Sequence, residues 1–393
     1  MQGNHKLFEI FVTFLKLGLT SFGGPIAHLG YFRKELVQRR QWVSDETYAQ
    51  ILALSQFLPG PASSQTAFAL GWQRGGSAGA MMATLGFTLP SAVIMIALAA
   101  WIGTAPPGPG WAGGLIAGLK ITAVAVVADA VWGMAGKLTP DLPRRAIALL
   151  AVAVLAVMPF GAAAQVCAIL AGAGIALIAR IGNAHDSATV TLHGPTKGVA
   201  LGCLALFTIL LLGLPLLAQT GGLTQIADVF YRAGALVFGG GHVVLPLLDA
   251  GVVGPGLVSN DSFLAGYGAA QAMPGPLFTF AGWLGQVAEG FPGAITALIA
   301  IFLPGFLLMA AALPFWSRLS ALPAARHAMA GANAAVVGLL AYALYDPVYT
   351  GAIRGADDLA LAVALFVMLR PARRPAWQVV ITGGIGGIAL AVL

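Results

Sequence analysis

Long apolar segments without any charged residue constrain this chain more than any other feature. Residues 77–103 and 198–218 contain no Asp, Glu, Lys or Arg. As helices, both are long enough to cross a hydrocarbon core of about 30 Å. Only 9% of the 393 residues are charged, whereas a soluble domain carries about 25%. The sequence therefore predicts an all-α polytopic membrane protein, with the lipid bilayer as its surroundings.

The excess of basic residues does not indicate a nucleic-acid partner. The formal net charge is +6, but the Lys and Arg residues lie beside the apolar segments, where the positive-inside rule places them in cytoplasmic loops. The first residues are polar and no small-residue cleavage site follows, so we expect no cleavable signal peptide. Cys167 and Cys203 both lie in apolar runs, so a disulfide is not expected.

A duplicated unit organises the chain. Three segments of the first half return in the second half, in the same order and at a nearly constant offset: Phe14–Gly24 returns as Phe230–Gly240, Ser55–Pro61 as Ala270–Pro276, and Leu89-Pro90 as Leu303-Pro304. Chance matches between apolar stretches would not keep this order. We therefore predict two homologous repeats, residues 1–181 and 198–393, joined by the linker 182–197.

The two repeats carry opposite charge after their Phe-Gly-Gly motifs. Residues 31–42 contain four basic side chains: Arg33, Lys34, Arg39 and Arg40. The matching residues 247–261 contain Asp249 and Asp261 but no Lys or Arg. By the positive-inside rule, the first loop faces the cytoplasm and the second faces away from it. The repeats are therefore predicted to be inverted, as in many secondary transporters.

Inversion requires an odd number of crossings between equivalent points, and two counts are possible. If every apolar segment spans fully, the basic loop Lys137–Arg145 falls on the opposite side from Arg33–Arg40, against the charge rule. If the Phe-Gly-Gly and Pro-Gly-Pro segments are re-entrant hairpins, five crossings separate the repeats: 77–103, 110–136, 144–159, 163–181 and 198–218. We favour the second count, with nine crossings and four re-entrant hairpins in all, because only Arg354 then breaks the rule.

The two Pro-Gly-Pro motifs are predicted to break a helix. Their prolines remove backbone donors and end the incoming helix, and the second proline suits the first turn of a new one. The free N–H groups at that new start carry roughly half an elementary charge and favour an anion. The candidate substrate-binding residues are Pro59, Gly60, Pro61, Ser63 and Ser64 in the first repeat, and Pro274, Gly275, Pro276 and Thr279 in the second. For one motif alone, a simple kink is the alternative.

Further candidates for substrate binding flank these breaks. Glycines of the Phe-Gly-Gly motifs let backbone approach a ligand, or another helix, closely; they are Gly23, Gly24, Gly239 and Gly240. Gln56 and Gln271 occupy matching positions before the Pro-Gly-Pro motifs. Their amides either donate to an oxyanion or satisfy the backbone at the break.

Five ionisable side chains lie in or beside apolar segments. Lys16 and Arg232 occupy the same repeat position, and we expect them to be counter-charges for a dianion. Snorkelling toward the membrane surface is the alternative. His28, His242 and Asp129 are candidates for carrying a coupling proton. Helix capping or hydrogen-bonded packing is the alternative for each histidine, and a structural ion pair is the alternative for Asp129.

Signals of an enzyme are missing from the sequence. No glycine-rich phosphate loop of the form G-x-x-x-x-G-K-[ST] occurs. No His and Cys residues have the spacing of a metal site. We therefore expect no catalytic activity, no metal and no organic cofactor.

Four blocks of sequence resemble the chromate ion transporter family in its long two-domain form. They are Ser21–Val37, Gln56–Gln65, Val237–Leu248 and Ala269–Gly285. The resemblance implies a secondary active transporter in a bacterial inner membrane that exports chromate and confers chromate resistance. Sulfate is an analogue with the same charge and shape, so a carrier of sulfate or another oxyanion is an alternative, as is a passive anion channel. A homodimer is also left open.

Overall fold

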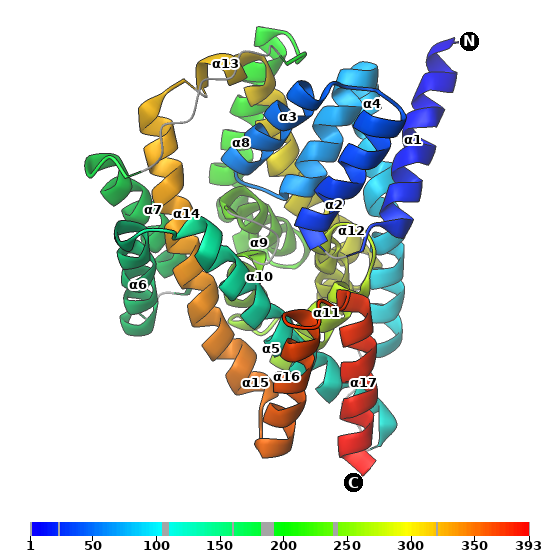
Figure 1. Cartoon of the computed structure of the whole chain (residues 1–393), viewed down its shortest axis with the longest axis vertical. Coiled ribbons are helices and arrows are strands. Elements are labelled where there is room, and N and C mark those ends of the chain that lie inside the picture. The colour runs from blue at the N-terminus through cyan, green and yellow to red at the C-terminus, as the bar shows by residue number, and fades with distance from the viewer. Residues whose placement is uncertain are drawn as a thin grey trace.

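The computed structural model describes residues 2–22, 24–103, 110–158, 161–181, 192–238, 243–319 and 321–392. Within these ranges the chain is built of helices and short connections, and contains no β-strand. Figure 1 shows the helices as one elongated bundle, with the N-terminus at the top and the C-terminus at the bottom. The predicted all-α architecture is confirmed.

Five helices of the described chain are long and apolar enough to cross a membrane. They are α4 (Ala62–Leu98), α5 (Trp111–Leu138), α8 (Lys197–Leu217), α12 (Phe280–Ala312) and α14 (Pro323–Ala343). The other four predicted crossings correspond to α6 (Leu142–Val157), α7 (Gly161–Ile178), α16 (Ala356–Leu369) and α17 (Ala376–Val392). These have 14 to 18 residues, fewer than the roughly 20 that a bilayer requires. The count of nine crossings therefore stays a prediction.

The main helices of the two repeats correspond in chain order, and only the short α13 (Trp316–Leu319) and α15 (Thr350–Ala352) of the described second repeat fall outside the match. In chain order, α1 (Gln2–Thr20), α2 (Gly24–Phe32), η1 (Arg33–Arg39) and α3 (Asp45–Phe57) match α9 (Gly222–Leu236), α10 (Val244–Leu248), η5 (Asp249–Val253) and α11 (Asn260–Ala272). The helices α4, α5, α6 and α7 then match α12, α14, α16 and α17. Helix α8 has no counterpart and joins the two halves.

A shared break in α4 and α12 shows how closely the repeats agree. Gly75 and Gly76 interrupt α4 with φ of −143° and 62°. Glu289 and Gly290 interrupt α12 with φ of −139° and 65°. The break separates a first segment, which follows the Pro-Gly-Pro motif, from a second segment that is long enough to cross the membrane. Each Pro-Gly-Pro motif therefore forms the tip of a helical hairpin, as predicted.

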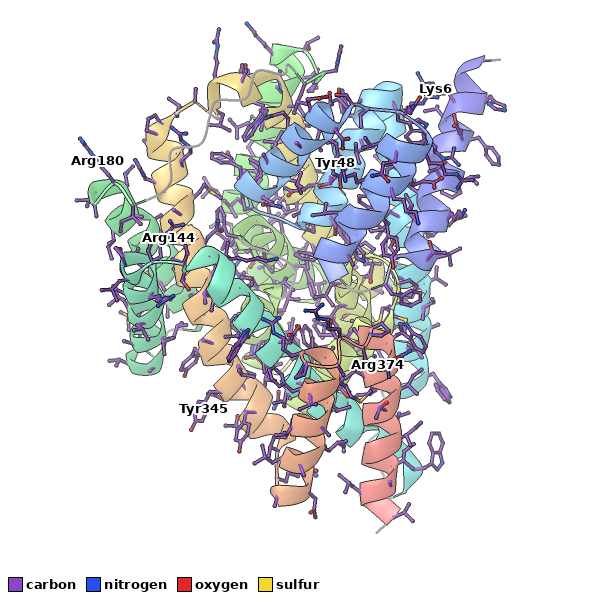
Figure 2. The ribbon with its side chains drawn as sticks, in the orientation of Figure 1. Lys6, Tyr48, Arg144, Arg180, Tyr345 and Arg374 are labelled. Atoms are coloured by element: carbon purple, nitrogen blue, oxygen red, sulfur yellow. The ribbon has the colours of Figure 1, made fainter. Side chains whose placement is uncertain are left out.

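The two repeats run in opposite directions. Figure 1 shows α14 running from the top of the bundle toward the bottom, whereas its equivalent α5 runs upward from the lower right. Likewise, α17 ends at the C-terminus at the bottom, while α7 ends two residues before Arg180, which lies at the upper left in Figure 2. Because α6 and α7 are an adjacent pair, counting them as crossings adds two and leaves the odd number unchanged. The repeats are inverted whether or not α6 and α7 cross the membrane.

The repeats interlock rather than forming separate domains in space. Helix α5 packs along α16 and α17 of the second repeat, and α14 packs along α6 and α7 of the first. Glycines allow this approach: a Cβ added at Gly118 would collide with the backbone of Gly383, and one at Gly331 with the backbone of Gly172. The predicted boundary at residues 182–197 therefore separates the repeats in the sequence only. In space, helices of each repeat pack on helices of the other.

Buried side chains form two cores beside the helix breaks. The larger core surrounds α5, α9, α11, α12 and α14, and a smaller one lies among α1, α2, α3 and α4. In the smaller core, the ring of Phe32 meets Phe14 and Phe87 edge to face, with centroids 5.7 and 5.0 Å apart. This cluster fixes α1 and α2 against α4 close to the first Phe-Gly-Gly motif.

Two backbone hydrogen bonds join the repeats at their broken helices. The N–H of Gly60, in the first Pro-Gly-Pro motif, donates to the carbonyl of Val237, just before the second Phe-Gly-Gly motif, at 2.7 Å. The N–H of Gly275, in the second Pro-Gly-Pro motif, donates to the carbonyl of Ser21, just before the first Phe-Gly-Gly motif, at 3.0 Å. We call these two contacts the first and second crossing. They are equivalent under the repeat.

The inverted topology predicts that the loop after α2 is cytoplasmic and the loop after η5 is external. In a chain whose Cys167 and Cys203 are replaced by alanine, we expect an impermeant thiol reagent added outside to label Pro255→Cys and to spare Gln38→Cys. Both positions are exposed, so only sidedness separates them. Labelling of Gln38→Cys from outside would contradict the orientation.

Gly275→Ala should destabilise the second crossing. Gly275 has φ of +91°, which an L-residue adopts only at a cost of about 1–2 kcal/mol. An added Cβ would also lie 2.9 Å from Ser91 Oγ and 3.3 Å from the carbonyl oxygen of Gly18. We expect a lower thermal unfolding temperature for the detergent-solubilised variant. Gly174→Ala, on α7 with open space around it, is the control and should be neutral or stabilising.

Candidate functional site

The first crossing places two predicted serines at the buried start of α4. Ser63 and Ser64 are 3% and 1% exposed, and the Oγ of Ser64 has no hydrogen-bond partner within the described structure. Buried polar groups without a partner are rare in proteins and call for a water or a ligand. Since α4 begins at Ala62, its first N–H groups lie beside this hydroxyl and favour an anion.

Gln65, which the sequence reasoning passed over, holds the first crossing in place. This side chain is fully buried. Its Nε2 donates to the carbonyl of Pro59 at 2.8 Å and to that of Gly305, on α12, at 3.1 Å. The amide therefore ties the Pro-Gly-Pro loop of one repeat to a helix of the other. Its position inside the block Gln56–Gln65 was the only signal in the sequence.

The second crossing has a different set of polar groups. Ser21 is fully buried and its Oγ has no partner among the described groups. His28 is 1% exposed and packs edge to face on Phe87. Thr279 donates to the carbonyl of Pro276 at 2.8 Å, so its hydroxyl proton already serves the backbone. Ser21 lies in the block Ser21–Val37, but it was not a predicted site residue.

The two glutamines before the Pro-Gly-Pro motifs have different surroundings. Gln56 is exposed, whereas Gln271 is half-buried and its Nε2 is a buried donor without a partner in the described chain. The repeat makes these positions equivalent, so the difference lies in the arrangement of the helices that carry them, α3 and α11.

Helix α11 packs along α5 of the other repeat, whereas α3 meets the other repeat through Trp316 of α13 (Trp316–Leu319), which donates to Gln50 at 2.9 Å and packs edge to face on Phe57. Helix α11 lies along α5 and α17, with Gly268 so close to the Leu119 backbone that a Cβ would collide with it. Lys120 on α5, only 3% exposed, donates to Asp261 on α11 at 2.5 Å. In the described chain, α3 makes no comparable packing with α14 or α7. One side of α3 therefore stays exposed where the equivalent side of α11 is covered by α5, while Gly60 and Pro61 at the first crossing are themselves buried.

The exposed face of α3 leads to the first crossing. Ala49, Ala53 and Gln56 are exposed and lie on one side of the helix. The opposite side is anchored, because the hydroxyl of Tyr48 (labelled in Figure 2) donates to the carbonyl of Leu29 on α2 at 2.6 Å.

Lys16 and Arg232 do not meet as the sequence suggested for two counter-charges of one anion. Arg232 forms an ion pair with Asp228, whose side chain is 4% exposed. Position 228 corresponds to Val12 in the first repeat, so only the second cation has a fixed partner. Lys16 is exposed and lines a groove of about 620 Å³ between α1 and the segment α2–η1.

That groove is basic. Besides Lys16 it is lined by Lys34, Glu35 and Arg39. Burial disfavours the Glu35 carboxylate, but hydrogen bonds from Arg40 and Arg39 outweigh this and hold the pKa of Glu35 below its usual value. Glu35 therefore stays ionised and neutralises Arg39. Lys16 and Lys34 are left as the uncompensated charges of the groove.

Of the remaining predicted residues, the structure describes Asp129 and Gly24 but not the other four. Asp129 forms an ion pair with Arg370 at 3.2 Å, which favours the structural alternative for this carboxylate. Gly24 begins α2 with φ of +75°. Gly23, Gly239, Gly240 and His242 lie outside the described residues. No group of three or more His, Cys, Asp or Glu side chains that could hold a metal is found within the described ranges.

Comparison with known proteins identifies the family. The model of a family described as "Chromate transporter" matches residues 8–178 and 224–388, one segment in each repeat. No solved structure is significantly similar to the chain.

Three similar proteins have names that refer to chromate. A "Probable chromate transport protein" of Synechococcus elongatus is 32% identical over 86% of this chain and 84% of its own length. A "Chromate transport protein" of Pseudomonas aeruginosa is 29% identical over 91% and 85%, and one of Cupriavidus metallidurans is 30% identical over 86% and 81%. The duplicated family match, the inverted repeats and these relatives agree, and the chain belongs to the chromate transporter family.

Proposed function

We propose that this protein is a secondary active transporter that exports chromate from the cytoplasm across a bacterial inner membrane and so confers chromate resistance. The observation that carries the proposal is the unequal closure of two equivalent hairpins. Helix α11 is sealed against α5, whereas the equivalent face of α3 is exposed. A carrier that alternates between two sides needs two such arrangements around one site. A passive channel would need both ends open together.

The exposed side of α3 lies at an end that carries several of the basic loops, whereas Arg374, in the loop between α16 and α17, lies lower in Figure 2. The labelled residues Lys6 and Arg180 lie at the upper end of the molecule in Figure 2, and α3 lies in the same upper part in Figure 1. The positive-inside rule makes this the cytoplasmic end. The uncompensated Lys16 and Lys34 would raise the local concentration of an anion there. This arrangement is the one expected before cytoplasmic chromate is loaded.

The membrane potential favours the proposed direction. A bacterial membrane is negative inside, and moving one elementary charge across 100 mV is worth about 2.3 kcal/mol. Outward movement of a dianion through 100 mV is then favoured by about 4.6 kcal/mol. The carrier must compensate the dianion's charge at the crossings, and helix N-termini with buried hydroxyls do this without a dedicated cation. A site of this kind does not require Lys16 and Arg232 to lie together.

Chromate is the proposed substrate because the relatives' names refer to it. Sulfate or another oxyanion is the second candidate, since hydroxyl and backbone donors respond to charge and shape and separate two tetrahedral dianions only weakly. Competition between the two anions is therefore part of the test.

Uptake of labelled chromate into everted membrane vesicles tests the proposal. We expect saturable uptake in energised vesicles that contain the protein, loss of uptake when a protonophore collapses the gradient, and weaker inhibition by sulfate than by unlabelled chromate. Vesicles preloaded with chromate should exchange it for external label without any gradient, because a carrier exchanges and a channel only equilibrates. Uptake that never saturates, or stronger competition by sulfate, would contradict the proposal.

Ser64→Ala tests the first crossing as the anion site. Because the Ser64 hydroxyl has no partner among the described groups, its removal should leave thermal stability unchanged. We expect the half-saturation concentration for chromate to rise about tenfold, which corresponds to one lost hydrogen bond to a charged group.

The matched control for Ser64→Ala is Ser55→Ala. The Ser55 hydroxyl lies 2.9 Å from that of Thr66 and donates to the carbonyl of Leu52 at 2.9 Å. Its loss should lower stability by about 1 kcal/mol and leave the half-saturation concentration unchanged. An unaltered half-saturation concentration in Ser64→Ala would remove this hydroxyl from the site.

A further inference from the structure

A second cavity lies at the opposite end from the basic groove. It encloses about 450 Å³ between the end of α6, the start of α7, the segment α10–η5 and the end of α14. Tyr345, next to the lining residue Asp346, lies in the lower part of Figure 2, whereas Lys6 and Arg180 lie at the top. Its polar lining side chains are Gln165, Asp249, Tyr342 and Asp346. This cavity is not part of the crossings.

Hydrogen-bond acceptors without a partner characterise this cavity. Gln165 is 8% exposed, and its Nε2 donates to the carbonyl of Pro246 at 3.0 Å, so its Oε1 remains the free end. That Oε1 and the Oδ1 of Asp249 are buried, and neither has a partner in the described structure. An amide oxygen and a carboxylate oxygen can only accept. What is missing is a donor, and a proton bound to a carboxylate supplies one.

The carboxyl groups of Asp249 and Asp346 interact repulsively. Asp249 is half-buried and Asp346 is exposed, and two like charges that line one cavity favour a state in which one of them holds a proton. Thr350 donates to Asp346 at 3.2 Å. Asp249 accepts no such bond through its Oδ1, so it is the member of the pair suited to take up the proton.

No described cation neutralises Asp249. The elements packed on η5 are α7, α9, α10 and α11. Helices α7 and α10 carry no charged residue. On α9, Asp228 and Arg232 pair with each other, and on α11, Asp261 pairs with Lys120. The other titratable groups on these elements and on the cavity wall are Cys167, Tyr231, Tyr267 and Tyr342.

The equivalent positions of the first repeat have the opposite character. Asp249 corresponds to Arg33, which pairs with Asp45. Tyr342 corresponds to Asp129, which pairs with Arg370. At these two positions the first repeat has its charges compensated by ion pairs, and the second repeat keeps an uncompensated carboxylate. The fold itself does not require this carboxylate, so a specific role accounts for it.

We infer that Asp249, with Asp346 and Gln165, binds the proton that the carrier exchanges for chromate; the inference rests on the proposed export. A proton from the outer side adds to the Asp249 carboxylate, and the new O–H donates to Gln165 Oε1 or to Asp346. The same O–H bond breaks when the proton leaves on the cytoplasmic side. Since η5 packs against α11, neutralising Asp249 lowers the cost of moving the hairpin that closes the outer end.

The test uses the purified full chain in liposomes, with two measurements on each variant. The first is accumulation of chromate in response to a pH gradient at zero membrane potential. The second is exchange of internal for external labelled chromate without a gradient. In the wild type, each exchanged proton should support about tenfold accumulation per pH unit. Asp249→Asn should keep the exchange and lose the accumulation. Asp357→Asn, an exposed carboxylate on α16, is the control and should keep both.

Each other outcome has a distinct meaning. Accumulation by Asp249→Asn that still follows the pH gradient would overturn the inference. Loss of exchange in Asp249→Asn would also overturn it, because the carboxylate would then serve the substrate step or the fold. A wild type driven by a sodium gradient but not by a pH gradient would exclude the proton and leave the proposed export intact. A wild type without any chromate exchange would contradict the proposed function, and this inference with it.

Discussion

The two backbone hydrogen bonds from Gly60 to Val237 and from Gly275 to Ser21 are the contacts on which the rest of the structure depends. A helix that stops inside a membrane leaves N–H and carbonyl groups that no water can satisfy. Here each break donates to the chain just before the break of the other repeat. Each hairpin tip therefore has a backbone partner in the other repeat, and the inverted duplication supplies both partners. The packing of α5 on α17 and of α14 on α7 adds helix contacts between the repeats.

The same duplication explains how one site can serve two sides. Equivalent hairpins can occupy equivalent positions, but the structure holds them in different ones, with α11 against α5 and α3 uncovered. Lys120 and Asp261 join the closed pair, whereas the repeat places Asn333 and Glu46 at the corresponding positions. An ion pair therefore joins α11 to α5. The equivalent contact between α3 and α14 would join the amide of Asn333 to the carboxylate of Glu46, which is a weaker interaction. The two ends are related by topology and differ in chemistry.

Charge follows the same division. At one end Lys16 and Lys34 line an open groove, while at the other end Asp249 and Asp346 line a cavity whose lining contains no cation. An anion is attracted at the first end, and a proton at the second. In the proposed orientation, this polarity favours loading of the anion from the cytoplasm.

The sequence by itself determined the membrane class, the repeats, the helix breaks and the inversion, because each depends on local rules of hydropathy, proline chemistry and loop charge. It also placed Ser64 at a helix start. Only the tertiary structure decided that Lys16 faces a surface groove, that Arg232 is paired with Asp228, and that Asp129 is paired with Arg370. Gln65 and Ser21 gained their positions through contacts with residues of the other repeat. Periodicity shows which residues share a helix face, but the partner of that face is set by how two distant segments pack.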